Sequence, residues 1–159
     1  MEVDVPKTIL LIVHITAAAL WIGPPLGVLP NVTRSLAAGR EALGVAIKDF
    51  NFRGLLSGIG GAGVLVTGVI MMFYSFGGFK TSPWPFHAAL GLVVLAMINS
   101  AAFGKGMKTL RAAHESFNDT TVTAARNAVK KMKPFSHINN ALWLGALVMM
   151  IIAKYINRA

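Results

Sequence analysis

The chain contains no cysteine and few acidic residues. Its 159 residues include six Asp and Glu against fifteen Lys and Arg, and charged residues make up only 13% of the total. Without thiols, a disulfide framework, a thiolate metal site and an iron–sulfur cluster are excluded. The six carboxylates fall near the termini or in expected loops, which argues against a carboxylate proton relay inside a membrane. A metal or cofactor would therefore be held by His, Met or oxygen.

Hydrophobic residues, in contrast, are abundant. They make up 55% of the chain, and the mean hydropathy is +0.62, which is typical of an integral membrane protein. A spanning helix needs about 20 apolar residues. We expect an all-α membrane protein with a single domain over 1–159, a four-transmembrane-helix bundle. The expected spans are Thr8–Leu29, Leu55–Phe76, Pro85–Gly104 and Ile138–Tyr155. Because "MEVDVPK" is acidic where a signal peptide is basic, we expect the first span to be retained.

The segments between the spans predict short cytoplasmic surface helices. The stretch "NVTRSLAAGREALGVAIKDFNFRG" alternates small, apolar and charged residues, which indicates one short helix. The stretch between spans three and four indicates two short helices joined at Asn118-Asp119-Thr120, whose side-chain oxygens can cap the second helix.

The basic residues predict the orientation of the chain. Lys and Arg are retained on the cytoplasmic side of a membrane, and eleven of the fifteen lie between spans one and two or between spans three and four. Both termini should therefore face outward in a multi-pass protein of the bacterial cytoplasmic membrane. The net charge of +9 then reports topology, and no nucleic-acid partner is expected.

Two histidines fall within expected spans at a similar depth. Span one runs inward, so at about 1.5 Å per residue His14 lies roughly 8–10 Å below the outer boundary. Span three also runs inward, and His87 lies within its first turn. Paired imidazoles on different transmembrane helices are typical of axial ligation of a haem. The pattern predicts that His14 and His87 hold the iron of a haem b.

Neighbouring residues fit the same cofactor. Ala18 and Gly91, each four residues after one of these histidines, would leave room for a macrocycle. The haem propionates need cations or hydrogen-bond donors near the outer interface, where Lys7, Lys80 and Trp84 are the candidates.

Simpler interpretations of the histidines remain open. An intramembrane imidazole can hydrogen-bond a neighbouring carbonyl or hydroxyl, and His87 can simply be wet at the interface. His137, at the inner start of span four, is a weaker candidate for an iron ligand, and we expect His114 to be solvated on a polar surface helix.

Methionine and glycine add two further patterns. A copper site is an alternative to haem, because thioethers together with imidazole suit copper(I); the methionines at matching depth are Met71, Met72, Met149 and Met150. In span two, the Gly54/Gly58 and Ser57/Gly61 spacings predict close helix packing, either within the bundle or across a homodimer face.

Three stretches carry a resemblance to a known group of proteins. "KTILLIVHITAAALWIG", "WPFHAALGLVVLAMINS" and "PFSHINNALWLGALVMMIIAK" resemble the first, third and last spans of small bacterial haem-binding membrane proteins. These include HemJ-type protoporphyrinogen oxidases and CopD-like copper-resistance domains. The distinctive residues are His14, Trp21, His87 and Asn139. The resemblance implies a haem b protein, commonly dimeric, with His14 as one ligand and His87 as a candidate second.

The chain departs from the oxidases at two places. They carry a Lys two residues after the third-span His, where this chain has Ala89, and an Asn-Glu-x-Pro in the last span, where it has Asn139-Asn140-Ala141-Leu142. We therefore expect a haem b-binding membrane cytochrome, a homodimer in the lipid bilayer, that transfers electrons with a quinone or another redox partner, or reacts with a small oxidant. Whether it is a haem-dependent oxidoreductase stays open. The alternatives are a HemJ-like protoporphyrinogen oxidase, a copper-binding or copper-transporting CopD-like protein, and a structural membrane protein without a cofactor.

Overall fold

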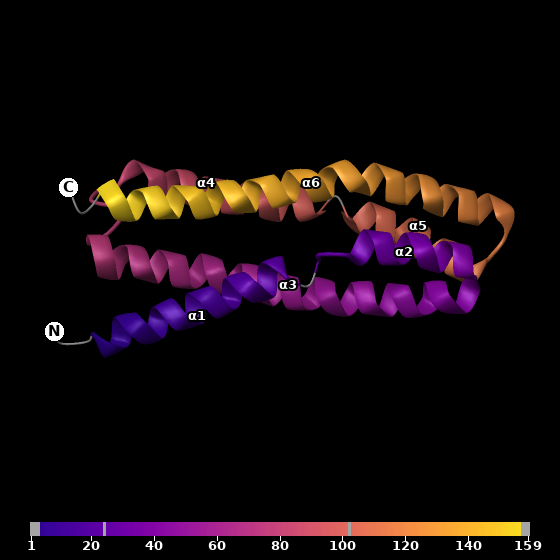
Figure 1. The fold of residues 1–159 in the computed structure, drawn as a ribbon, viewed down its shortest axis with the longest axis horizontal. Helices are drawn as coiled ribbons and strands as arrows, with labels where there is room; N and C mark the ends of the chain where they lie inside the picture. The colour runs from indigo at the N-terminus through magenta and orange to yellow at the C-terminus, as the bar shows by residue number, and fades with distance from the viewer. Residues whose placement is uncertain (1–3, 24, 102, 157–159) are drawn as a thin grey trace.

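The computed structural model describes residues 4–23, 25–101 and 103–156, and these residues form helices joined by short turns, with no strand among them. Figure 1 shows the helices running along the long axis of the molecule. Their bounds are α1 Val5–Ile22, α2 Val28–Ala38, α3 Arg40–Phe76, α4 Trp84–Ala101, α5 Phe103–Glu115 and α6 Asp119–Ile156.

Within these ranges, four helical segments are long and apolar enough to cross a membrane, and they correspond to the four expected spans. Two of these segments belong to much longer helices, since α3 has 37 residues and α6 has 38. At about 1.5 Å per residue each is roughly 55 Å long, against about 30 Å for the hydrocarbon core of a bilayer. The expectation of separate surface helices directly before spans two and four was therefore wrong, because those residues continue the spans as one helix.

The helices form two stacked layers (Figure 1). The spanning layer consists of α1, residues 55–76 of α3, α4, and residues 138–156 of α6. The extension consists of α2, residues 40–54 of α3, α5, and residues 119–137 of α6. Both chain ends and the α3–α4 connection lie at the far end of the spanning layer (Figure 1). We call this the terminal end; which side of a membrane it faces remains a prediction.

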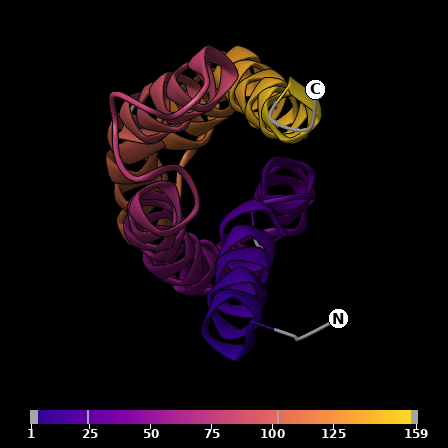
Figure 2. The same ribbon diagram turned by 90° about the vertical axis from the view of Figure 1, so that its left-hand side faces the viewer.

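Helix packing in the spanning layer is pairwise. The main contacts are those of α1 with α3 and of α4 with α6, and α3 and α4 touch less extensively. Figure 2, viewed from the terminal end, shows an open ring in which α3 lies between α1 and α4. Helices α1 and α4 are therefore not packed against each other.

Exposed apolar side chains separate the two layers. Large hydrophobic residues exposed to the surroundings are frequent in residues 5–26, 52–98 and 135–156, whereas Val45 is the single one in the described parts of 27–51 and 99–134. A surface this rich in aliphatic side chains is expected next to lipid and not next to water. The layer boundary therefore coincides with the expected edge of the hydrocarbon region.

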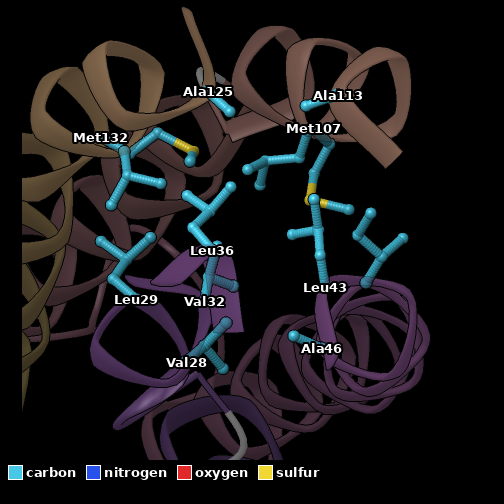
Figure 3. Packing of buried hydrophobic residues seen from close by; sticks show 13 residues of the cluster. Val28, Leu29, Val32, Leu36, Leu43, Ala46, Met107, Ala113, Ala125 and Met132 are labelled. Carbon is cyan, nitrogen blue, oxygen red and sulfur yellow. The ribbon is translucent and has the colours of Figure 1, made fainter. Parts of the chain in front are cut away.

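The extension has a core of its own, shown in Figure 3. Val32, Leu43 and Leu110 are fully buried there, and Met107 and Met132 fill the space between the helices. The backbone N–H of Thr121 donates to Asn118 Oδ1 over 3.0 Å, which confirms the predicted cap at the start of α6. Because Leu43 of α3 and Leu110 of α5 join one core, these helices pack as a small bundle beyond the membrane segments.

Candidate functional site

Glycines bring α1 and α3 into close contact. A Cβ added to Gly60 would lie 2.7 Å from the Ala17 carbonyl oxygen, and one added to Gly63 would lie 3.0 Å from the Ala17 Cβ. The Ser57 hydroxyl donates to the Trp21 carbonyl oxygen over 2.9 Å. Small residues at a helix interface allow this approach, so the glycine-rich face of α3 fixes α1 within the bundle.

One turn beyond this contact, His14 meets Thr67. The His14 Nδ1 lies 2.7 Å from Thr67 Oγ1, and the Thr67 hydroxyl donates to the Gly63 carbonyl oxygen over 2.6 Å. A hydroxyl has a single proton to give, so the Thr67 oxygen accepts from Nδ1–H of His14. The hydrogen-bond network thus assigns the tautomer of His14. Its Nε2 carries the lone pair.

This arrangement is the one that orients a histidine for metal binding. Ligating imidazoles usually donate their second ring N–H to a nearby oxygen, which fixes the tautomer and the ring plane. Gly68 packs against the ring, since a Cβ there would lie 3.6 Å from His14 Cε1, at ordinary van der Waals distance. No group of three or more His, Cys, Asp or Glu that could hold a metal occurs in the described residues. His14 would act through a single nitrogen.

His87 lies in a different setting at the terminal end. Its side chain is exposed and stacks on Phe79 with ring centroids 6.2 Å apart. Its Nε2 lies 3.2 Å from Ser82 Oγ, whose proton goes to the Phe79 carbonyl oxygen over 3.0 Å. Ser82 therefore accepts from Nε2–H, which leaves the lone pair of His87 on Nδ1.

The structure brings His14 together with Thr67 and not with His87. The two histidines belong to helices that do not pack on each other, and each has its own hydrogen-bond partner. Joint ligation of one iron by both stays a prediction.

The remaining candidates are divided between open and packed positions. Lys7, Lys80 and Trp84 are exposed, as expected for groups at an interface. Ala18 is partly buried against the apolar cluster of the spanning layer, whereas a Cβ on Gly91 would meet nothing within 4 Å. Gly91 therefore borders open space and Ala18 does not.

The other two histidines lie on the extension side of the molecule. His137 is exposed on α6. His114 is half-buried, with Nδ1 3.2 Å from the Arg40 carbonyl oxygen, and a Cβ on Gly44 would lie 2.7 Å from its Cε1. The expectation of a solvated His114 holds only in part, because the partly exposed ring also packs against the start of α3.

A cavity of about 280 Å³ lies where the two layers meet. All six helices and Pro25 of the α1–α2 connection contribute to its lining, and no described lining residue is a histidine. The lining residues are Trp21, Pro25, Val28, Leu29, Phe50, Arg53, Gly54, Ser57, Gly58, Gly61, Met97, Ser100, Phe103, Ser136, Asn139 and Asn140. Sequence reasoning missed this cavity. The available signal was the Gly54/Gly58 pair, which borders open space in the structure instead of a packed helix.

The methionines that suggested copper are ordinary residues of the spanning layer. Met72 is fully buried, and Met150 borders a narrow apolar crevice together with Leu65 and Val93. Copper ligation by these thioethers stays a prediction.

Comparison of the chain with protein-family models, with curated proteins and with solved structures gave no match.

Proposed function

We propose that this chain is a multi-pass haem protein of the bacterial cytoplasmic membrane, in which His14 is the axial ligand of a haem b. The observation that carries the proposal is the pair of hydrogen bonds from His14 to Thr67 and from Thr67 to Gly63. Together they place the lone pair of His14 on Nε2 and hold the ring against α3. Thr67 pairs Nδ1 only, and Nε2 of His14 has no hydrogen-bond partner among the described residues. An ionisable side chain within an apolar helix indicates a functional site.

Thr67 would support haem binding in one way, and Lys7 and Lys80 in another. Thr67 sets the tautomer of His14 and raises its basicity as a ligand. Lys7 in the first turn of α1 and Lys80 in the α3–α4 connection, both exposed, would neutralise the propionates. A haem held in this way supplies one-electron redox chemistry, and a coordination position left open would admit a small ligand. Because His87 lies in a separate setting, we favour one protein ligand in each chain.

The proposal is tested by absorption spectra of the purified protein in detergent, with and without dithionite, and by haem extraction into pyridine. We expect a haem b spectrum in the wild type and its loss in His14→Ala. Thr67→Val keeps the shape of the side chain but removes the acceptor for Nδ1–H, so haem affinity should fall about 10-fold to 100-fold. His87→Ala should retain the haem.

Thr33→Val is the matched control, because the Thr33 hydroxyl also donates to a carbonyl four residues earlier, that of Leu29, without contacting a histidine. It should bind haem like the wild type. A colourless wild type without extractable haem would overturn the proposal, and stoichiometric bound copper would favour the copper alternative. Loss of haem in His87→Ala but not in His14→Ala would also contradict it.

A further inference from the structure

The cavity at the layer boundary is placed to receive a molecule from the membrane. Trp21 near the end of α1 and Met97 near the end of α4 belong to the spanning layer, whereas Val28 and Phe103 begin the helices of the extension, and all four line the cavity. The polar head of an amphiphile lies at this level when its tail lies in hydrocarbon. The cavity therefore suits a ligand with a polar head and an apolar tail.

Asn139, a mostly buried residue, supplies a hydrogen-bond donor to this cavity. Its side chain lines the cavity and is 6% exposed. Asn99 Nδ2 donates to the Phe135 carbonyl oxygen over 2.8 Å, which fixes the Asn99 amide, so the Asn139 atom 3.4 Å away from that nitrogen is the acceptor Oδ1. The Nδ2 of Asn139 has no partner among the described residues. Trp143 Nε1 is the one fully enclosed side-chain donor without a partner in the described part of the chain, so Asn139 Nδ2 keeps some exposure and a ligand in the cavity can reach it.

The one charged side chain and two of the hydroxyls in the described lining already have partners, which favours a neutral acceptor as the ligand. Arg53 Nε lies 2.8 Å and 2.9 Å from the two carboxylate oxygens of Asp49, so the one charged side chain in the described lining is already compensated. The hydroxyls of Ser57 and Ser100 donate to the carbonyl oxygens of Trp21 and Ala96. A phosphate head would bring an uncompensated negative charge, whereas a carbonyl oxygen would not.

The walls favour a flat ring. Trp21, Phe50 and Phe103 contribute aromatic surface, and the Trp143 ring lies against Trp21 with centroids 5.3 Å apart. The volume of about 280 Å³ lies just below the range of about 300–1,000 Å³ for small-molecule pockets. A single substituted ring fits this space better than the head and two chains of a phospholipid.

We propose that this cavity binds the ring of a quinone-type amphiphile, with Asn139 Nδ2 donating to a ring carbonyl oxygen and the tail leaving towards the bilayer. The site contains none of the residues assigned to haem, so the proposal does not rest on the proposed function. It goes beyond it by assigning a second, separate site.

Tryptophan fluorescence provides a direct test, because quinones quench nearby indoles and Trp21 lines the cavity. The purified protein in detergent is titrated with decylubiquinone. We expect saturable quenching in the wild type. In Asn139→Ala the dissociation constant should rise by about tenfold or more, because the site loses the donor that pairs with the ligand.

A second variant distinguishes loss of quinone binding from a folding defect. Gly58 lines the cavity, and a Cβ there meets nothing within 4 Å. Gly58→Leu should therefore fill the cavity without displacing the helices, and it should abolish saturable quenching while the thermal midpoint is retained.

Two matched controls keep the same chemistry outside the cavity. Asn127 is exposed on α6, and Gly104 borders open space on α5. Asn127→Ala and Gly104→Leu should each bind within about twofold of the wild type.

Two results would overturn the proposal. The first is linear quenching of the same size in the wild type, Asn139→Ala and Gly58→Leu. The second is displacement of the quinone by short-chain phosphatidylglycerol at lower concentrations than by a second quinone, because the cavity would then be a lipid site. Loss of haem binding in His14→Ala with quinone binding intact would keep the two sites apart.

Discussion

At the residue scale, Gly58 and Gly60 of α3 have different roles. A Cβ on Gly60 would press on the backbone of α1, lying 2.7 Å from the Ala17 carbonyl oxygen and the Leu20 carbonyl carbon. A Cβ on Gly58, two residues earlier, would meet nothing within 4 Å. Gly60 is therefore needed for packing, whereas Gly58 shapes the cavity.

We accordingly expect Gly60→Ala to destabilise the protein by about 1–3 kcal/mol, because α1 has to move away from α3. Gly58→Ala should be neutral or slightly stabilising, by up to about 1 kcal/mol, since alanine is the better helix former. Thermal unfolding in detergent, followed by circular dichroism, compares the two. Equal midpoints for both variants would contradict the close contact.

The candidate site shows what a sequence can and cannot predict at this scale. His14 stands out because an imidazole is rare in an apolar run. Its partner Thr67 is 53 positions away, and only the packing of α1 on α3 brings the two together. His87 was paired with His14 by its depth in the membrane and by the resemblance of the third span to known haem-binding proteins. The depth of a residue does not say where its helix lies in the open ring of helices, and α3 lies between α1 and α4.

At the scale of elements, hydropathy located the spans but not the helix ends. A hydropathy window detects where apolar residues stop, whereas a helix stops only where its backbone hydrogen bonds do. Residues 40–54 contain good helix formers and no proline, so α3 continues through the boundary. In α6 the helix continues even past Pro134. The cavity was missed for the same reason. It forms at the layer boundary, where the continuous helices α3 and α6 lie beside the breaks between α1 and α2 and between α4 and α5.

The extension should unfold separately from the spanning layer. Leu110 is fully buried in the extension core, and Leu110→Ala should cost about 2–5 kcal/mol. We expect faster hydrogen–deuterium exchange in α2 and α5, with little change in α1 and α4, measured by mass spectrometry. Val45→Ala is the control, because Val45 is 69% exposed. Equal loss of protection in both layers would contradict separate cores.

At the scale of the whole molecule, charge and apolar surface divide between the layers. The extension carries most of the Lys and Arg residues, and the spanning layer carries the exposed aliphatic side chains. Basic residues are retained on the cytoplasmic side. We therefore predict that the extension lies in the cytoplasm and that the terminal end faces outward.

The absence of cysteine allows this orientation to be tested with single labels. Thr81 lies in the exposed α3–α4 connection at the terminal end, and Ser116 is exposed in the α5–α6 turn of the extension. With a membrane-impermeant maleimide, Thr81→Cys should be labelled in spheroplasts, whereas Ser116→Cys should be labelled only after the membrane is permeabilised. The cysteine-free parent controls for background. The reverse pattern would place the extension outside, and then the basic residues could not be a retention signal; they would have to be explained by a partner of the extension.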